Sequence, residues 1–258
     1  MNWATKRKLQ YVGGLLLFIV LILFWVLYPI IFPKPTCTDL KQNGDETGVD
    51  CGGSCSLMCK KDVSDPVVLW SRAFPVTGNI YNLVAFVENQ NNNSGVENAS
   101  YEFRVYDVNN RLIGRREGTT FIPPSKQFAI FEARFDPGVA QVKSVTFEFT
   151  DPLVWTKRAP TLNNLEVFVD NIAMGEDKKS PSLSARIKNE SIQDLPSFEV
   201  IAILYDVDHN AINASKTIKD GLKSGSDTTV FFTWPEALTG EPVIKDVLVS
   251  INPFSVSF

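Results

Sequence analysis

The sequence LVAFVEN at residues 83–89 returns as LSARIKN at residues 183–189, and VYDVN at 105–109 returns as LYDVD at 204–208. Both pairs are separated by about one hundred residues. In the first pair, alternate positions are apolar, which is the period of a strand with one buried and one solvated face. These positions are Leu83, Ala85 and Val87 in the first copy and Leu183, Ala185 and Ile187 in the second. The chain therefore contains an internal repeat made of β-strands.

The sequence around this repeat continues the same pattern from residue 65 to the end. Short runs rich in Val, Ile, Phe and Tyr are separated by Gly, Pro, Asn and Asp at intervals of roughly ten residues, and no helical period is sustained. The turns that follow 105–109 and 204–208 contain Asn, Asp and His, which predicts a hairpin in each copy. A repeat of this length, with some seven strands, matches a β-sandwich of the immunoglobulin or fibronectin type.

The predicted fold is therefore mainly β, with tandem sandwiches at 65–152 and 153–258. No Gly/Ser-rich linker separates them, which predicts two sandwiches placed end to end as a semi-rigid rod. Two polar segments are expected on the surface: an exposed loop at 159–181 and a mobile tip at 89–94.

The N-terminal segment has a different character. Residues 11–32 are 22 uncharged residues, and as a helix they would span roughly 33 Å, enough to cross a bilayer. Lys6, Arg7 and Lys8 precede this run and the single Lys34 follows it, so the N-terminus is expected in the cytoplasm. We predict a cytoplasmic tail at 1–8, a transmembrane helix at 9–32 and an extracytoplasmic remainder.

A cleaved signal peptide is the alternative for this segment. Signal peptides have shorter apolar regions, of about 7 to 15 residues, followed by a small-residue cleavage site. The run here is longer and continues into YPIIFPKP at 28–35. The sequence favours an uncleaved, single-pass anchor.

The charge balance argues against a nucleic-acid partner. The chain has 25 Lys+Arg and 29 Asp+Glu, and three of the basic residues lie before residue 34. The remainder thus carries 22 basic against 29 acidic groups, without a Lys/Arg cluster to attract phosphates.

Four cysteines, Cys37, Cys51, Cys55 and Cys59, fall in one window directly after the membrane exit. An even number of cysteines in a Gly-rich extracytoplasmic segment predicts two disulfides, and three pairings are open. Their segment, 36–60, is expected to be a small module of its own. A zinc site made of four thiolates is the less favoured alternative outside the cytoplasm.

The segment 36–55 resembles the C-x-D-x(3)-N-G-x-E-T-x(2)-D-C-G-G-x-C module of surface and secreted proteins of diverse bacteria and some protists. The resemblance implies a disulfide-bonded spacer outside the cytoplasm and no enzymatic activity. Residues 103–107 and 202–206 resemble small extracytoplasmic β-sandwiches of the F-x-L-Y-D type, although only the first copy has the Phe, at Phe103. Together these features are similar to membrane-anchored surface proteins of bacteria, including those of the candidate phyla.

The cysteine module also contains candidate cation ligands. Clustered carboxylate and amide oxygens around two glycines could wrap Ca²⁺. The spacing is not that of a D-x-D-x-D-G loop, and acidic turn residues often only form Asx-turns. The candidate calcium ligands are Asp39, Asn43, Asp45, Glu46 and Asp50.

No catalytic motif is apparent. The only histidine, His209, lies in a predicted turn, and nothing singles out a pair of carboxylates for a hydrolase. Aromatic residues could form a platform for a glycan or peptide, but packing in the sandwich cores is the favoured reading. These residues are Trp70, Phe74, Phe128, Trp155, Trp234 and Phe254.

The sequence thus predicts a non-enzymatic, membrane-anchored extracytoplasmic protein that binds a protein or glycan through its sandwiches. The alternative is an accessory subunit of an envelope machine for secretion, pilus or wall assembly, and a hydrolase is less favoured. Strand addition to a sandwich edge is a plausible contact mode, but the sequence does not identify the edge.

Overall fold

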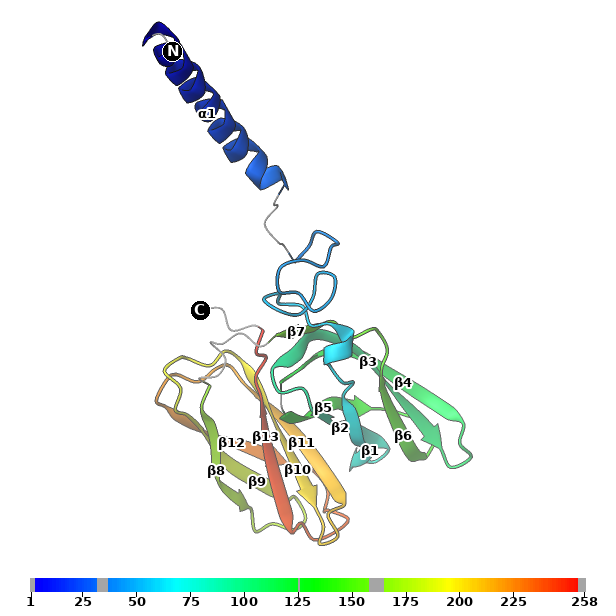
Figure 1. Cartoon of the computed structure of the whole chain (residues 1–258). Coiled ribbons are helices and arrows are strands. Elements are labelled where there is room, and N and C mark those ends of the chain that lie inside the picture. The colour runs from blue at the N-terminus through cyan, green and yellow to red at the C-terminus, as the bar shows by residue number, and fades with distance from the viewer. Residues whose placement is uncertain (1–2, 32–36, 125, 158–164, 255–258) are drawn as a thin grey trace. The chain divides into compact units, whose positions relative to one another are not determined.

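The computed structural model describes residues 3–31, 37–124, 126–157 and 165–254. It divides into two compact units, Met1–Ser56 and Leu57–Phe258. The described chain is mainly β, as predicted: one long helix precedes thirteen strands, and a 3-10 turn, η1 (Lys60–Asp62), lies before the first strand (Figure 1).

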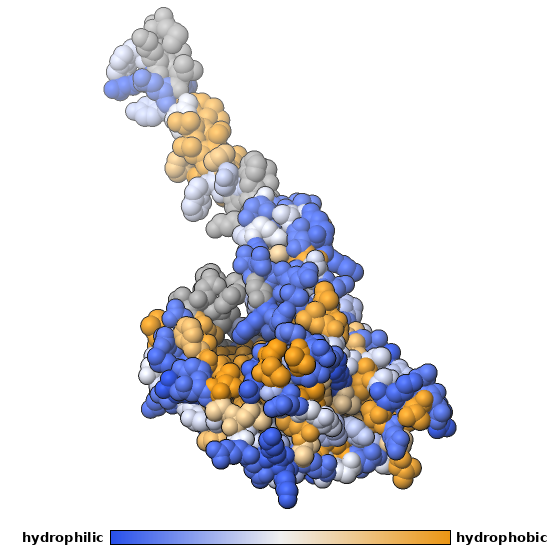
Figure 2. Space-filling view, turned by 90° about the horizontal axis from the view of Figure 1, so that it is seen from below, coloured by the Kyte–Doolittle hydropathy of each residue, from blue (hydrophilic) through white to orange (hydrophobic). Residues whose placement is uncertain are grey.

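The first unit contains the helix α1 (Trp3–Ile31) and most of the cysteine module. Gln10–Tyr28 is long and apolar enough to cross a membrane, and hydrophobic residues cover the middle of α1 in Figure 2. This helix fits a membrane anchor or a signal sequence. It begins earlier than predicted, so Arg7 and Lys8 belong to its first turns, whereas the predicted last residue, Phe32, lies outside the described part.

The first sandwich consists of two antiparallel sheets. One has the order β1-β2-β5 and the other the order β4-β3-β6, with β7 paired to the beginning of β3. Side chains that alternate along β2 and β3 meet between these sheets and form its core. The strands are β1 (Val67–Thr77), β2 (Ile80–Asn89), β3 (Ser94–Asp107), β4 (Leu112–Ile122), β5 (Lys126–Phe135), β6 (Val142–Phe149) and β7 (Trp155–Lys157).

The second sandwich repeats this plan with the orders β12-β9-β8 and β11-β10-β13. The central strand β9 corresponds in position to β2, and β10 corresponds to β3. A separate core lies between its two sheets. The strands are β8 (Val167–Met174), β9 (Ser182–Asn189), β10 (Phe198–Tyr205), β11 (Ala211–Lys219), β12 (Asp227–Thr233) and β13 (Ile244–Ser250).

A third core joins the two sandwiches. The outer face of β1-β2-β5 packs against the outer face of β11-β10-β13, which buries Val84 and Phe86 from one sandwich with Ile201 and Ile203 from the other. Leu57–Phe258 is therefore a stack of four sheets with three apolar layers between them. The predicted end-to-end rod is wrong, because the sandwiches lie face to face instead.

The reason is visible in the two central strands of the inner sheets. β2 buries five consecutive residues, from Leu83 to Val87, and β10 buries six, from Val200 to Tyr205. A strand covered on both faces is a continuous apolar run and does not alternate. The alternation of Leu83, Ala85 and Val87 indicated only the face that points into the first sandwich.

Two surface predictions are also corrected. The predicted loop 159–181 contains β8, whose Val167 and Val169 pack on the second core; residues 158–164 lie outside the described part. The predicted tip 89–94 is corrected only at its ends: Asn89 and Ser94 are 1% and 2% exposed, whereas Gln90, Asn92 and Asn93 between them are exposed, and the mobility of the tip stays a prediction. Because β7 pairs with β3, the first sandwich extends beyond Pro152, where the sequence analysis placed its boundary.

The repeated residues perform matching tasks. The Asn89 side-chain amide donates to the carbonyls of Ser94 and Pro123, and that of Asn189 donates to the carbonyls of Gln193 and Leu222. Each buried asparagine lies at the end of a central strand and donates to one carbonyl in the segment that follows the strand and to one carbonyl in a segment further along the chain.

Candidate functional site

The cysteine module is held by side chains that accept hydrogen bonds from its backbone. The Asp50 carboxylate accepts from the N–H groups of Asp39 and Leu40, at 2.9 Å each. Asp39 accepts from the Lys41 N–H and from the Asn43 side-chain amide. These bonds fix turns that lack regular secondary structure.

The remaining acidic residues of the module are used in the same way. Glu46 Oε2 accepts from the Asn43 N–H at 3.1 Å, and Asp45 Oδ1 accepts from Ser54 Oγ at 2.7 Å. Four of the five candidate calcium ligands, the carboxylates, therefore accept from several separate backbone and side-chain donors within the module, whereas the fifth, Asn43, donates to Asp39 and its Oδ1 has no hydrogen-bond partner among the described residues. Calcium binding stays a prediction of the sequence.

Two adjacent glycines explain the Cys-Gly-Gly part of the motif. Gly52 and Gly53 both have positive φ, at 77° and 53°. A Cβ on Gly52 would lie 1.9 Å from Thr47 Oγ1, and one on Gly53 would lie 2.0 Å from the Asp45 carbonyl oxygen. Only glycine fits both the conformation and the space.

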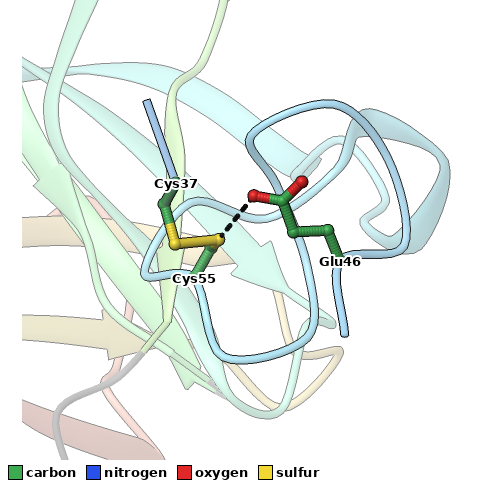
Figure 3. A group of neighbouring side chains, drawn as sticks. All are labelled: Cys37, Glu46 and Cys55. Carbon is green, nitrogen blue, oxygen red and sulfur yellow. Dashed lines mark hydrogen bonds between the residues drawn. A yellow bond between two sulfur atoms is a disulfide. The ribbon is translucent and has the colours of Figure 1, made fainter. Parts of the chain in front are cut away.

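The cysteines form two disulfides, as predicted. Cys37 and Cys55 are bonded with a Cα–Cα distance of 5.6 Å, and Cys51 and Cys59 are disulfide-bonded as well. Glu46 Oε1 lies 3.3 Å from Cys55 Sγ (Figure 3). Because a bridged sulfur carries no hydrogen, this approach is a packing contact. The ligand atoms of Cys37, Glu46 and Cys55 lie as close together as those of a metal site. Because the two sulfurs are joined in a disulfide, however, they offer no thiolates to zinc.

The residues considered for catalysis lie in two different settings. His209 is exposed at positive φ in the β10–β11 turn. Two carboxylates do meet on the outer face of β3 and β6: Arg104 binds Glu102 at 2.6 Å and Glu148 at 2.5 Å. Both carboxylates thereby bind one guanidinium, and Glu102 is only 6% exposed.

The aromatic residues lie in the cores, as the favoured reading predicted. Phe74, Phe128, Trp155 and Trp234 are buried, and Trp70 packs against Phe74 and Phe86 in the layer between the sandwiches. Phe254 is half-buried and its ring lies close to Gly95 of β3. These six residues therefore do not form an exposed platform for sugar rings.

A feature that the sequence analysis missed is the end of the sandwiches at which six turns collect. Because neighbouring strands are antiparallel, the turns β1–β2, β3–β4, β5–β6, β8–β9, β10–β11 and β12–β13 all lie at one end of Leu57–Phe258 (Figure 1). We call this end the loop face. Four of its turns expose an apolar residue that is more than half accessible: Val108, Val139, Val207 and Val243.

Hydrogen bonds join the two sandwiches at and near the loop face, and others join turns within the first sandwich. The Gly78 N–H donates to Glu236 Oε1 at 3.1 Å. The Arg72 guanidinium donates to the Ala211 carbonyl at 2.7 Å and reaches Asn210 Oδ1. Asn79 donates to the carbonyls of Gly138 and Ala140 in the β5–β6 turn. The loop face is thus one surface built by two sandwiches.

Two of its turns are fixed by the repeated aspartate. Asp107 Oδ1 accepts from the N–H groups of Asn109 and Arg111, and Asp206 Oδ1 accepts from those of Asp208 and Asn210. These backbone hydrogen bonds stabilise the carboxylates and lower the pKa of both aspartates below the usual 3.8. The valine of each turn, Val108 or Val207, is held at its tip.

Charged groups also lie in the layer between the sandwiches. Asp246 shares a strand face with Ile244 and Leu248, which pack on this layer. Burial raises the pKa of Asp246 above 3.8, and burial with the nearby Asp246 charge raises the pKa of Tyr205 to about 12.

The sequence did contain a signal for the loop face. Two of its four valines, Val108 and Val207, follow the repeated Tyr-Asp dipeptides in 105–109 and 204–208. A valine in a turn of Asp and Asn is unexpected, because turns are usually polar.

No protein-family model and no curated protein matches the chain. Among solved structures, it resembles red sea bream transglutaminase, with a TM-score of 0.25 and 14% identity over 73% of this chain and 31% of that one. It also resembles a beta-glucuronidase from glycoside hydrolase family 2, with a TM-score of 0.26 and 10% identity over 87% of this chain and 28% of that one. This chain spans less than a third of the length of either protein.

Proposed function

We propose that this protein is a membrane-anchored extracytoplasmic binding protein without catalytic activity, and that the loop face binds a partner protein. α1 serves as an uncleaved anchor with its N-terminus in the cytoplasm, and the disulfide module and sandwiches lie outside. The observation that carries the proposal is the apolar layer between the sandwiches, which makes the two sets of turns one preorganised surface. Preorganised loops lose little conformational entropy when they bind.

The chemistry of the loop face supports a protein partner more than a glycan or a lipid. Sugar rings stack on aromatic faces, whereas the exposed apolar residues at these tips are valines. Anionic lipids attract basic clusters, but the turns contain both Lys178 and Lys179 and acidic residues such as Glu236 and Glu241. Apolar tips in a polar surround match the apolar core and polar rim of a protein–protein interface.

The experiment is crosslinking in the native membranes, followed by mass spectrometry of the captured proteins. Three forms are compared: the natural protein, a form with α1 replaced by an unrelated membrane helix, and the triple variant Val108→Ser, Val139→Ser, Val207→Ser. We expect the anchor-swapped form to capture the same partner and the loop variant to lose it.

The opposite result would favour the alternative function. If the anchor-swapped form loses its partners and the loop variant keeps them, α1 is the specific contact. The protein is then better described as a subunit of a membrane-embedded envelope machine, and the proposal for the loop face fails.

A further inference from the structure

A groove of about 740 Å³ lies on the first sandwich, at the end opposite the loop face. One wall is the segment 57–68, which precedes and begins β1, and the other is the segment 147–155, which includes the end of β6 and the beginning of β7. Most of its lining is apolar, with Val68, Phe149 and Val154 among the residues.

The groove exists because the two sheets separate along one side of the sandwich. Ser71 Oγ donates a hydrogen bond of 2.8 Å to the Val145 carbonyl and thereby closes the sheets near the middle of β1. Beyond that point the pairing of β1 with β2 skips Leu69, between Val68 and Trp70. Such a bulge bends a strand and increases its twist, which leads the beginning of β1 away from β6.

The strands beside the groove have uncovered edges. Among the described strands, β1 pairs only with β2, and β6 pairs only with β3. Val67, Val68 and Leu69 are consecutive apolar residues, and each is between 37% and 41% exposed. On the β6 side, the residues after Val145 are Thr146, Phe147, Glu148 and Phe149, and the one charge among them, Glu148, is paired with Arg104 of β3. An edge with so little free charge beside an apolar groove can accept another strand.

The charges on the rim indicate what kind of strand would fit. The charged residues of the lining are Lys60, Asp65, Glu148 and Asp151. Glu148 is already paired with Arg104, which leaves exposed Asp65 and Asp151 against one lysine. The rim is therefore acidic and complements a basic segment.

We propose that this groove binds an extended segment of a partner protein in which apolar and basic residues alternate. The segment adds as a strand to the end of β6 beyond Val145, where β6 borders the groove. Its apolar side chains enter the groove beside Val68 and Val154, and its basic side chains meet Asp65 and Asp151. Main-chain hydrogen bonds to β6 supply affinity, and the groove supplies selectivity. This site is separate from the loop face.

The test uses the full-length protein in lipid nanodiscs and two synthetic peptides as long as β6, which has eight residues. One peptide alternates Lys and Val and the other alternates Glu and Val. Binding is measured by fluorescence anisotropy, and amide hydrogen exchange of β6 is followed with and without peptide. Two variants address the groove, Val154→Lys and the double variant Asp65→Lys, Asp151→Lys. Val139→Lys is the matched control, because it changes an exposed valine outside the groove.

We expect the Lys-Val peptide to bind at least about tenfold more tightly than the Glu-Val peptide and to slow exchange in β6. Both groove variants should abolish this preference, whereas Val139→Lys should keep it. Equal binding of the two peptides, or binding that Val154→Lys leaves intact, would overturn the proposal. A dimer of the natural protein that Val154→Lys converts to a monomer would also overturn it, because the occupant would then be a second copy of the chain.

Discussion

The backbone N–H of Gly78, in the first turn of the first sandwich, donates a hydrogen bond of 3.1 Å to Glu236 Oε1, in the last turn of the second. The two residues are 158 positions apart in the sequence. They meet because the inner sheets of the two sandwiches pack face to face, and this packing places the turns of both at the same end.

Removing a side chain from the layer between the sandwiches should destabilise the whole stack. Ile203 is fully buried there against the first sandwich. We expect Ile203→Ala to lower the free energy of unfolding by about 2 to 5 kcal/mol, through lost apolar contact and the cavity that remains. Chemical denaturation followed by circular dichroism measures this change.

The exposed Phe231 of β12 provides the control, since Phe231→Ala removes a larger side chain from a solvated face. It should change stability by less than about 0.5 kcal/mol. An effect of Ile203→Ala as small as the one expected for Phe231→Ala would show that the layer between the sandwiches contributes little to stability.

The two buried asparagines should have similar energetic roles. Asn89→Ala and Asn189→Ala each remove the side-chain donor from two backbone carbonyls, although the Leu222 carbonyl keeps its bond from the Leu195 N–H. Unsatisfied buried acceptors cost about 1 to 3 kcal/mol. Both variants should therefore lower stability by that amount in denaturant titrations. A neutral effect at either site would mean that water replaces the lost amide there.

The sequence was sufficient to predict a fold made mainly of β-sandwiches. Alternation of apolar residues in β6 and β9, and turn residues at regular intervals, predict strands with one buried face. The corresponding residues of the repeat, such as Tyr106-Asp107 and Tyr205-Asp206, do occupy corresponding strand ends. These signals are local, so a single sequence displays them.

The face-to-face packing of the sandwiches has a signal in the sequence, but the sequence analysis interpreted it as alternation with one buried face. Val84 and Phe86 interrupt the alternation of β2, and Ile201 and Ile203 do the same in β10. Such apolar runs indicate burial on both faces. The apolar runs do not indicate which surface covers the second face of each strand. The loop face depends on that packing of the two sandwiches, and the groove depends on the local pairing of β1.

Stability should depend on pH through Asp246. Burial raises the pKa of Asp246 above its usual 3.8, so the folded protein holds this proton more tightly than the unfolded chain. The contribution of Asp246 to stability is therefore present below pH 3.8 and is lost as pH rises through the folded pKa.

We expect Asp246→Asn to raise the melting temperature at pH 7. The melting temperature of this variant should also fall less than that of the natural protein between pH 4 and pH 7. Scanning calorimetry over that range measures both effects. The comparison is Asp206→Asn, where the folded pKa is lowered; this substitution should instead cost stability at pH 7, and the difference from the natural protein should shrink as pH falls below 4. A lower melting temperature of Asp246→Asn at pH 7 would contradict this account.

Loss of the Cys37–Cys55 disulfide should destabilise the cysteine module and leave the sandwiches intact. The Cys37–Cys55 bond closes a loop with a sequence separation of 18, and a loop of that size is worth about 3 kcal/mol through restriction of the unfolded chain. We expect the double variant Cys37→Ser, Cys55→Ser to lose amide protection in residues 39–50 under hydrogen exchange. Strands β9 and β10 should keep theirs, and peptide mapping of the natural protein should recover Cys37 linked to Cys55. Recovery of another partner for Cys37 would contradict the structure.

The central claim is that the two sandwiches form one body, and small-angle X-ray scattering of the fragment Leu57–Phe258 tests it most directly. A compact body of this size has a radius of gyration of about 17 to 19 Å. Two sandwiches placed end to end, each with a radius of gyration of about 13 Å, would give a value above about 22 Å. We predict the smaller value. The larger one would mean that the sandwiches do not pack through β2 and β10 and that the loop face is not a single surface.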